Sequence, residues 1–425
     1  MIYLDAAATT LQKPSAVARA SGYAMGHMAS PGRGGHPPAM LAADTVFACR
    51  ERAAELFHVR EPDDVVFTMN ATHGLNIAIK SIVKPGDTVL ISGYEHNAVT
   101  RPLAAIPNVR VKVATSRLFD PQEILRQFRE QLTSEVDCVI CNHVSNVFGY
   151  VLPVVEIADL CAGRGVPFVL DASQSAGSMP IYMDQLRASF IAMPGHKGLY
   201  GPQGTGILLC DHEVIPLLEG GTGSLSARQE MPDFLPDRLE AGTQNVTGIA
   251  GLLEGLRFIQ RKGPEVILNH ERFLAARCAD ALSALPGVRV FAAPRLFCQA
   301  GVLSFQVDGM DCEDVGQALG EQGIAVRSGS TARRWRTAPQ GRWMSGPYGS
   351  VFPPLTPAEM WTRWPELWRG CPDANKSIPK RIVCASARGS SPRALVLFFS
   401  GFFYEIKGKL MGGVLAICKR IQYNI

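Results

Sequence analysis

The stretch Phe190-Ile-Ala-Met-Pro-Gly-His-Lys-Gly-Leu-Tyr-Gly-Pro-Gln-Gly-Thr-Gly206 places Lys197 directly after His196 and ahead of a glycine-rich run. Glycine lets a backbone bend sharply and leaves room for a ligand. A lysine that is desolvated in such a turn can act as a nucleophile and form a Schiff base. Taken alone, the stretch is more typical of a surface lysine in a flexible loop, so the sequence upstream has to decide.

Polar side chains follow three upstream apolar runs that are typical of buried strands. The runs and their polar groups are Val166–Leu170 with Asp171 and Gln174, Cys138–Cys141 with Asn142–Asn146, and Thr88–Ser92 with Glu95–Asn97. Ligands of open α/β sheets bind beyond the carboxyl ends of the strands. An acid, an amide, an imidazole and a lysine at such ends suit a pyridine ring that carries an aldehyde.

Eight short motifs, in order along residues 1 to 329, resemble the class V family of pyridoxal-phosphate enzymes, and most of all its cysteine desulfurases and selenocysteine lyases. The motifs are Tyr3–Thr10, Arg33–His36, Asn70–Asn76, Glu95–Asn97, His143–Gly149, Asp171–Gln174, Gly195–Lys197 and Arg238–Asn245. Each is weak alone, but eight in the family's order leave little room for chance. The resemblance implies the cofactor pyridoxal 5'-phosphate.

The resemblance also implies an α/β architecture, the PLP-dependent transferase fold (fold type I). A large doubly wound domain with a mixed, mostly parallel sheet is expected at residues 16-245. An incomplete, smaller α+β domain is expected from residues 1-15 and 246-329. Strand and helix signals alternate through residue 210, which is typical of a doubly wound sheet. The remaining residues, 330-425, form a tail outside the family that we expect to be irregular.

The family pattern assigns the residues around the cofactor ring. Lys197 is expected to hold the aldehyde and His96 to stack on the ring, and these two are the expected catalytic residues. Asp171 is expected to pair with the ring nitrogen, because a nearby negative charge favours its protonated form. Asn146 and Gln174 are candidates for the phenolic oxygen.

The phosphate is expected at the start of a helix that follows a strand at residues 65–68. A helix amino terminus has free N–H groups and a partial positive charge, so Ala71, Thr72 and His73 are the expected cradle; a simple helix cap is the alternative. His196 is expected to contact the phosphate as well. By resemblance, Thr222 reaches the phosphate of a neighbouring subunit, which implies a homodimer; a mobile surface loop is the alternative.

Several positions depart from the family pattern. Ala6 replaces an asparagine and Pro194 replaces a frequent serine, so two polar contacts are missing. After Gly329 the family has a loop with a histidine and a nucleophilic cysteine, and then a strand with an arginine for the substrate carboxylate. Neither is present: the next cysteine is Cys371, and Cys312 is not at the position of the sulfur-accepting cysteine.

Charge and tryptophan content change after Gly329. Residues 330 to 425 hold 15 Lys+Arg and 4 Asp+Glu, whereas residues 1 to 329 hold 27 and 34, and all five tryptophans follow residue 330. Codons for Ser330 to Thr337, read one base earlier, can encode Leu-His-Cys-Ala-Pro-Leu-Ala-His, which resembles the family's cysteine loop. The same shift over Pro347 to Thr356 permits the arginine-bearing strand. We therefore expect the tail to be a frameshifted translation of the original gene.

The composition bounds the remaining classes of function. A chain of 425 residues with a net charge of +4 gives no reason to expect nucleic acid. The sequence shows neither a signal segment nor an apolar run long enough to span a membrane, so we expect a cytoplasmic protein with no membrane partner. Cys138 and Cys141 lie in a strand-like run that cannot turn both sulfurs to one ion, so no metal is expected.

The function implied by the resemblance is that of a cysteine desulfurase, which converts L-cysteine to L-alanine and transfers the sulfur to an enzyme cysteine. The missing cysteine loop predicts that this activity is impaired. The alternatives are another class V reaction (aminotransferase, β-eliminating lyase or selenocysteine lyase) and a non-catalytic cofactor-binding product. The expected partners are L-cysteine or selenocysteine, a second copy of the chain and a sulfur-acceptor protein.

Overall fold

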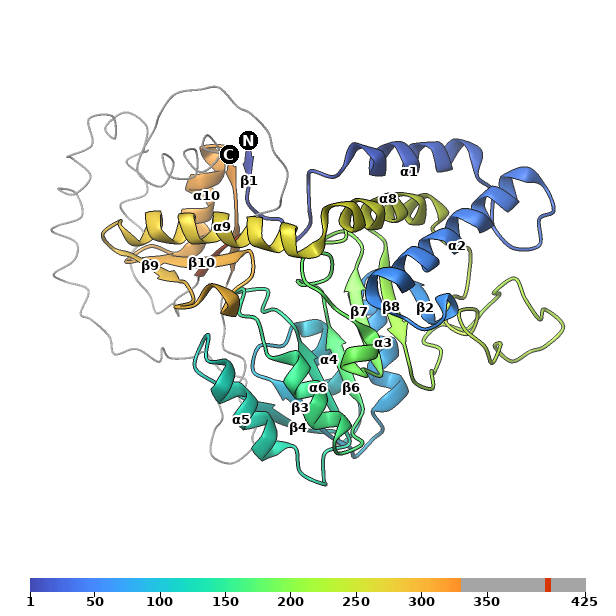
Figure 1. Cartoon of the computed structure of the whole chain (residues 1–425), viewed down its shortest axis with the longest axis horizontal. Helices are drawn as coiled ribbons and strands as arrows, with labels where there is room; N and C mark the ends of the chain where they lie inside the picture. Colours follow the sequence, from blue (N-terminus) through green and yellow to red (C-terminus); the bar gives the residue numbers. More distant parts are fainter. Residues whose placement is uncertain (330–393, 399–425) are drawn as a thin grey trace. The chain divides into compact units, whose positions relative to one another are not determined.

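The computed structural model describes residues 1–329 and 394–398, which form two compact units (Figure 1). The large unit consists of residues 7–271 and 293–300. The described residues of the small unit are 1–6, 272–292, 301–329 and 394–398. The predicted domains, 16-245 and 1-15 with 246-329, were drawn from the family resemblance. The two units are drawn from contacts within the structure and have other boundaries, so the predicted domain boundaries stay a prediction.

A seven-stranded sheet forms the centre of the large unit, in the order β2-β8-β7-β6-β5-β3-β4. The strands are β2 (Val65–Thr68), β3 (Thr88–Ser92), β4 (Arg110–Ala114), β5 (Cys138–Asn142), β6 (Phe168–Asp171), β7 (Phe190–Pro194) and β8 (Gly206–Cys210). The pairs from β4 through β7 are parallel, whereas β8 pairs antiparallel with both β7 and β2. The predicted mixed, mostly parallel sheet is therefore confirmed.

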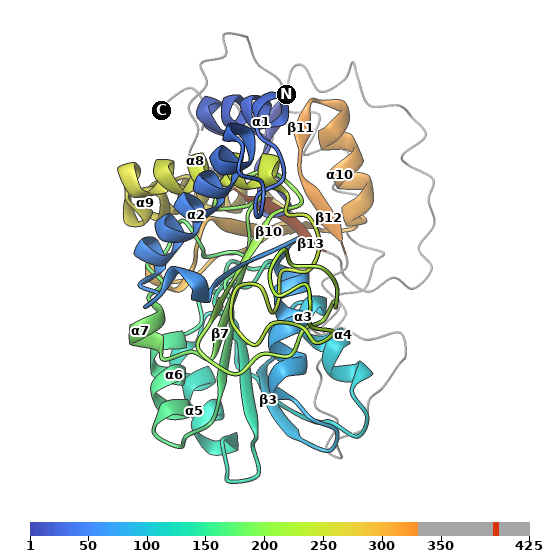
Figure 2. The same cartoon turned by 90° about the vertical axis from the view of Figure 1, so that its right-hand side faces the viewer.

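Helices cover both faces of this sheet. Figure 2 shows α3 and α4 on one side of the strands and α5, α6 and α7 on the other. The helices of the large unit are α1 (Ser15–His27), α2 (Pro37–Phe57), α3 (Ala71–Ile82), α4 (Asn97–Ala105), α5 (Pro121–Gln131), α6 (Val154–Ala162), α7 (Met183–Leu186) and α8 (Val246–Lys262). Because both faces are covered, β3, β5, β6, β7 and β8 are buried along their whole length and read as continuous apolar runs.

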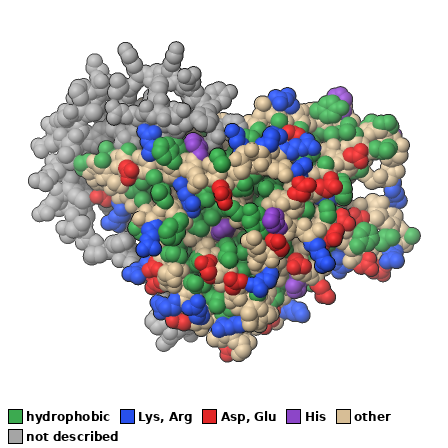
Figure 3. All heavy atoms as spheres, in the orientation of Figure 1, with side chains coloured by type: hydrophobic (Ala, Val, Ile, Leu, Met, Phe, Trp, Pro, Cys, Tyr) green, Lys and Arg blue, Asp and Glu red, His purple; other side chains and the backbone are tan. Residues whose placement is uncertain are grey.

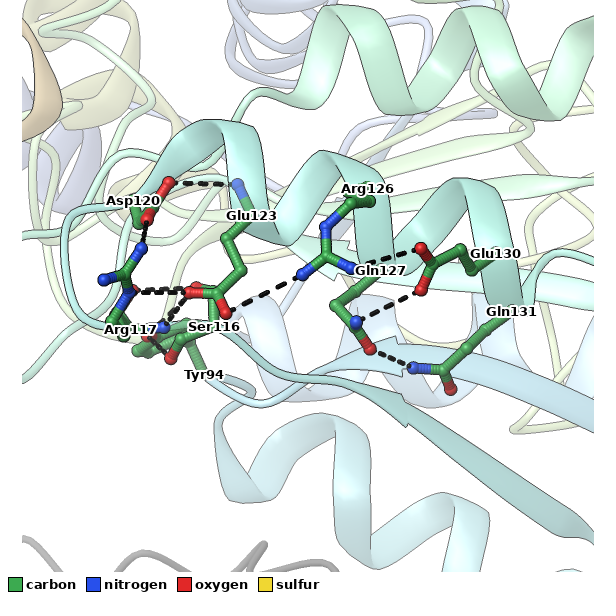
Figure 4. A network of polar contacts seen from close by, with 9 residues as sticks. All are labelled: Tyr94, Ser116, Arg117, Asp120, Glu123, Arg126, Gln127, Glu130 and Gln131. Atoms are coloured by element: carbon green, nitrogen blue, oxygen red, sulfur yellow. Dashed lines mark hydrogen bonds and ion pairs between the residues drawn. The ribbon is translucent and has the colours of Figure 1, made fainter.

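Local side-chain bonds decide where α5 begins (Figure 4). Asp120 caps the helix, because its Oδ1 accepts the backbone N–H of Glu123 at 3.0 Å. Arg117 donates to both carboxylates, at 2.8 Å to Asp120 and 3.2 Å to Glu123. Arg126 and Glu130 add an exposed pair one turn apart. Such exposed pairs contribute little to stability, and the cap is the contact that fixes the start of the helix.

The small unit holds two short sheets. Strand β1 (Ile2–Tyr3) pairs in parallel with β11 (Ile324–Ala325), and a four-stranded sheet has the order β12-β13-β10-β9. Its strands are β9 (Val288–Phe291), β10 (Val302–Val307), β12 (Arg327–Gly329) and β13 (Ala394–Phe398). The carboxyl-terminal part of α9 (Pro264–Ser283) and α10 (Cys312–Glu321) belong to this unit. Leu282, Leu303 and Phe305 are among its buried core residues.

Strand β13 lies in the tail that is predicted to be irregular, and residues 394–398 are the part of that tail that the structure describes. The prediction for the tail as a whole stays a prediction. The strand pairs antiparallel with both β10 and β12. The segment Ala-Leu-Val-Leu-Phe is a short apolar run, and its backbone supplies hydrogen bonds to two neighbouring strands at once. The predicted frameshift, the position of Cys371 and the five tryptophans lie outside the described residues.

The described helices include none that is both long and apolar enough to cross a membrane. Within the same part of the chain, His, Cys, Asp and Glu side chains form no group of three that could hold a metal ion.

Candidate active site

A pocket with a volume of about 100 Å³ lies where the sheet of the large unit meets the start of α3. Eight of the ten predicted cofactor-binding residues line it: Ala71, Thr72, His96, Asn146, Asp171, Gln174, His196 and Lys197. Asn142 and Pro194 line it as well. His73 and Thr222 are not among the lining residues.

Strand register explains why these residues meet. Asn142 at the end of β5 is the pairing partner of Asp171 at the end of β6, and Asp171 is paired with Ala192 on β7. The carboxyl ends of these parallel strands therefore lie at one edge of the sheet, with the Lys197 turn following β7. This is the edge at which open α/β sheets bind their ligands.

Asp171 is a buried carboxylate, only 4% exposed. Its Oδ1 accepts the backbone N–H of Ser173 at 2.9 Å, and its backbone oxygen accepts the N–H of His143 at 3.0 Å. These contacts hold the carboxyl in a fixed orientation at the pocket wall. A buried carboxylate there favours a positively charged group in the pocket.

Two buried polar atoms of pocket residues have no hydrogen-bond partner among the residues that the structure describes: Gln174 Oε1 and His196 Nδ1. Gln174 uses its amide nitrogen on the backbone oxygen of Ala7, at 3.1 Å. Burial, followed by the charges of Lys197 and Lys13, lowers the pKa of His196 to about 4, so its imidazole is neutral. Because buried polar atoms are normally paired, these two call for a polar ligand.

The start of α3 is capped by Asn70, whose Oδ1 accepts the backbone N–H of His73 at 3.0 Å. The His73 ring accepts from Met69 N at 3.3 Å. The backbone N–H and the ring Nδ1 of His73 are therefore both bonded within the helix cap. A helix cap is the alternative to a phosphate cradle that the sequence leaves open for this segment. Ala71 and Thr72 remain at the pocket, where the amino terminus of the helix favours an anion.

Close backbone packing fixes the turn that carries Lys197. A Cβ on Gly198 would lie 2.2 Å from the backbone oxygen of Ala176, so only glycine fits there. Gly195 donates its N–H to Thr205 O at 2.8 Å, and a Cβ on Gly195 would lie 2.1 Å from Thr205 Oγ1. From the sequence, these glycines were expected to leave room for a ligand. In the structure, Gly195 and Gly198 instead allow the backbone of the turn to pack closely.

The segment before α1 contacts this turn and adds a residue that the sequence analysis did not single out. Lys13 Nζ donates to the backbone oxygen of Thr10 at 2.8 Å and to its Oγ1 at 2.9 Å. The Thr10 hydroxyl lies 3.0 Å from His196 O and 3.2 Å from Lys197 O. An ammonium only donates, so the Thr10 hydroxyl hydrogen is left to bond the carbonyls of the Lys197 turn. The Tyr3–Thr10 motif, which ends three residues before Lys13, was the one sequence signal that this segment contacts the site.

Thr222 lies in a segment without helices or strands between β8 and α8. Its Oγ1 is 3.2 Å from Ser224 Oγ. Arg33, from the second family motif, donates to Ser226 in the same segment at 2.6 Å. The segment therefore contacts another family motif, although it does not line the pocket of its own chain.

The structure describes eight cysteines, all of them buried, and no disulfide forms among them: Cys49, Cys138, Cys141, Cys161, Cys210, Cys278, Cys298 and Cys312. Burial raises the pKa of Cys138 and of Cys141 far above the usual range of a thiol. Sulfur nucleophiles act as exposed or partly exposed thiolates. Within residues 1–329, then, the cysteines are suited to packing and not to attack on a substrate.

Comparison with known proteins places the chain in a family. Residues 2–345 match the aminotransferase class-V family. A probable cysteine desulfurase of Methanothermobacter thermautotrophicus is 32% identical over 342 residues, which cover 77% of this chain and 84% of the relative. A probable cysteine desulfurase of Mycolicibacterium paratuberculosis is also 32% identical over 342 residues, but there the match spans only 49% of the relative's own length.

Solved structures agree with this placement. The apo structure of a cysteine desulfurase from Thermococcus onnurineus NA1 has a TM-score of 0.70 and 30% sequence identity, covering 77% of this chain and 84% of that one. A mutant of C-DES with glycine covalently linked to its PLP cofactor has a TM-score of 0.69 and 25% identity, covering 77% and 88%. The chain therefore belongs to the aminotransferase class-V family, within which it is cysteine desulfurase-like.

Proposed function

We propose that the chain binds pyridoxal 5'-phosphate in this pocket and acts on L-cysteine by cysteine desulfurase-type chemistry. The observation that carries the proposal is the presence of Lys197, Asp171 and His96 in one pocket, beyond the carboxyl ends of β7, β6 and β3, in a chain similar to cysteine desulfurases. The C-DES structure with a covalently linked PLP cofactor supports the choice of cofactor.

The pocket residues match the groups of this cofactor. Asp171 suits the ring nitrogen, His96 the ring face, and Gln174 and Asn146 the phenolic oxygen. The unpartnered Gln174 Oε1 and His196 Nδ1 would both gain partners. The free N–H groups at Ala71 and Thr72, with neutral His196, suit the phosphate.

The cofactor, when bound, supplies an aldehyde for amines and a ring that accepts an electron pair from the substrate Cα. The protein's part is positioning and proton transfer. Lys197 Nζ would hold the aldehyde and, once the amine of the substrate has displaced it, would carry a proton at the substrate Cα. Asp171 would keep the ring nitrogen protonated. The enclosed walls around Asp171 and Gln174 strengthen these interactions by limiting water.

Borohydride reduction of the chain with pyridoxal phosphate, followed by peptide mapping, tests the proposal. The expected result is one labelled peptide with the modification on Lys197. Labelling of another lysine with Lys197 unmodified would refute this assignment. A matched Lys197→Arg variant, which keeps the charge, should take up no label.

We also propose that sulfur transfer is impaired in this chain. The family's cysteine loop is absent from the sequence after Gly329, and the described cysteines are buried. The buried cysteines favour a second candidate function, a transamination or β-elimination that needs no cysteine nucleophile. Assays of alanine, sulfide and pyruvate formed from L-cysteine separate these functions, because β-elimination gives pyruvate and desulfuration gives alanine.

A homodimer is part of the same proposal. Large apolar side chains are exposed on α1, on α2 and on the segment that carries Thr222: Tyr23, Met25, Met40, Phe47, Ile215, Leu218, Leu225 and Phe234. Figure 3 shows apolar side chains on the surface over α1 and α2. Exposed apolar surface of this kind is typical of an interface, and light scattering of the purified chain measures its mass. The sulfur-acceptor protein and the cytoplasmic location stay predictions from the sequence.

A further inference from the structure

Glu95 lies in the turn between β3 and α4, directly before His96 of the pocket. The residue as a whole is half-buried, but its carboxyl oxygen Oε2 is enclosed and has no hydrogen-bond partner within residues 1–329 and 394–398. Its other oxygen, Oε1, accepts the Ser92 hydroxyl and, at 2.8 Å, the backbone N–H of Asn142. Glu95 therefore joins the end of β3 to the end of β5, although it does not line the pocket.

The turn is anchored to Asn142 at more than one point. The Asn142 side-chain amide donates to the backbone oxygen of Tyr94 at 2.9 Å, and the Ser92 hydroxyl lies 3.2 Å from Asn142 Oδ1. On the outer side, the Tyr94 hydroxyl donates to Ser116 O at 3.1 Å (Figure 4). Residues 92–95 are thus held at both ends, and Glu95 is their contact nearest to His96.

The position of His96 follows from this turn. His96 Nδ1 accepts the backbone N–H of Ala98 at 3.1 Å and so caps α4. The ring is bound to the start of its own helix, while the backbone before it is bound through Glu95 to Asn142. Asn142 is in turn paired with Asp171 in the sheet. Glu95 consequently connects the two pocket residues that are expected to contact the cofactor ring.

The proton of Glu95 can be located from the same contacts. Oε1 already accepts two donors, whereas Oε2 has none, so a proton on the carboxyl belongs on Oε2. The titratable groups that face Glu95 are Asp171 on β6 and Cys141 on β5. Neither is cationic, and among the described residues no ion pair is formed by Glu95. Burial, with a smaller contribution from the charge of Asp171, raises the pKa of Glu95 to about 8.

We propose that Glu95 is a positioning residue that works as a neutral acid: it ties the His96 turn to Asn142 and leaves Asp171 as the only carboxylate charge at this edge of the pocket. The proposal rests on the proposed cofactor site. Ionised Glu95 would add a second negative charge close to Asp171 and would leave an enclosed carboxylate oxygen without a donor, both of which are unfavourable.

Glu271 provides a matched control. It is 3% exposed, its Oε2 also lacks a partner among the described residues, and burial raises its pKa to about 8. It does not line the pocket. The two glutamates therefore share an enclosed, unpartnered carboxyl oxygen and a raised pKa, and they differ in their connection to the site.

The first measurement needs no cofactor. Thermal melts of the full chain are compared with those of Glu95→Gln and Glu271→Gln from pH 5 to 9. Glu95 and Glu271 bind a proton more tightly in the folded chain than in the unfolded chain, because burial raises their pKa from 4.5 to about 8. The wild type should therefore lose stability as the pH rises toward about 8. Each glutamine variant should gain about 3 °C or more in Tm relative to the wild type between pH 5 and 9. A Glu95→Gln difference that is constant with pH would overturn the neutral acid.

The second measurement is the dissociation constant of pyridoxal phosphate, followed by absorbance at pH 6.5 and pH 9. Glu95→Leu, which removes the acceptor, should bind about tenfold or more weakly, whereas Glu95→Gln and Glu271→Leu should stay within about threefold of the wild type at pH 6.5. Between the two pH values, the wild type should weaken more than Glu95→Gln. Wild-type affinity in Glu95→Leu would overturn the positioning role. Failure of the wild type itself to bind the cofactor would instead refute the proposed function.

Discussion

Thr10 donates its backbone N–H to the carbonyl oxygen of His196 at 3.0 Å. Two segments 186 residues apart in the chain are thereby joined directly at the turn that carries Lys197. Lys13 completes the connection from the other side of Thr10. The geometry of the candidate site thus depends on the segment before α1 as much as on the sheet.

Replacement of Lys13 should reveal this contact through its pH dependence. Burial lowers the pKa of Lys13 to about 8. The folded chain then binds this proton less tightly than the unfolded chain, so the charged amine destabilises the fold below about pH 8. That cost disappears as the pH rises from about 8 toward the ordinary lysine value of 10.5. In thermal melts, the Tm of the wild type should rise relative to that of Lys13→Met between pH 7.5 and 10.

Lys13→Arg is the control for this experiment, because a guanidinium stays charged over the whole range. The Tm difference between Lys13→Arg and Lys13→Met should stay constant as the pH rises. A wild type that behaves like Lys13→Arg would show that Lys13 is not desolvated in the folded chain.

Gly198→Ala should destabilise the large unit by about 1–3 kcal/mol. The added Cβ would meet the backbone oxygen of Ala176 at 2.2 Å, and no rotamer change can relieve a clash between backbone atoms. Urea unfolding measures the loss. Gly22→Ala in α1 is the matched control, because its added Cβ would meet no described atom within 4 Å beyond the adjoining residues and backbone of its own helix, and alanine favours a helix by about 0.5–1 kcal/mol. Equal stabilities of the two variants would mean that the turn relaxes freely.

Exchange of the Cα proton tests the proposed catalytic residues without requiring sulfur transfer. The chain loaded with pyridoxal phosphate should exchange the Cα hydrogen of L-alanine for deuterium in D2O, as followed by NMR. Lys197→Ala and Asp171→Asn should each lower the rate by about 100-fold or more, because they remove the proton carrier and the partner of the ring nitrogen. Undiminished exchange in Asp171→Asn would remove this carboxylate from the mechanism.

Glu240→Ala should cost about 3–5 kcal/mol of stability. Glu240 pairs with Arg50, both side chains are 6% exposed, and its other oxygen accepts the N–H of Phe67 at 2.6 Å. Removal of the carboxylate leaves a buried guanidinium without its counter-ion. The double variant Arg50→Met/Glu240→Leu should recover much of the loss in urea unfolding, whereas no recovery would show that the cost comes from lost packing.

The nucleotide sequence across codons 325 to 360 tests the proposed frameshift. Read one base earlier, it should encode the histidine–cysteine loop directly after Gly329. A protein translated in that frame should exceed this chain in desulfurase turnover by about 1,000-fold or more, because it regains the nucleophile of a covalent mechanism. If the shifted frame encodes no such loop, the tail is an original part of the protein.

The sheet and most of the pocket could be predicted because the signals are local. Asp171 and Asn142 each follow an apolar run, and the carboxyl ends of parallel strands must meet at one edge. The role of Glu240 could not be predicted in this way, although its motif was noticed. Its partner Arg50 lies 190 residues away in the chain, and no local pattern of residues indicates that pairing.

Three further features could not be read from local patterns: the contact of Lys13, strand β13 and the cap at His73. Lys13 approaches the Lys197 turn only through Thr10, a contact that no periodicity reveals. The strand Ala394–Phe398 forms because β10 and β12 accept it on both sides, whereas its sequence resembles any short apolar run. His73 was predicted from the helix start, but competition from the Asn70 side chain for its N–H depends on the conformation of the cap.

The position of β13 between β10 and β12 has a consequence for any shortened version of this chain. In the described part of that sheet, β13 is the only neighbour of β12 and one of the two neighbours of β10. Loss of residues 394–398 would leave β12 without its described neighbour and the Val302–Phe305 backbone open along one side. An open apolar strand edge is a template for pairing with other chains. Truncation after Gly329 would therefore expose a strand edge to which a second copy of the chain can pair.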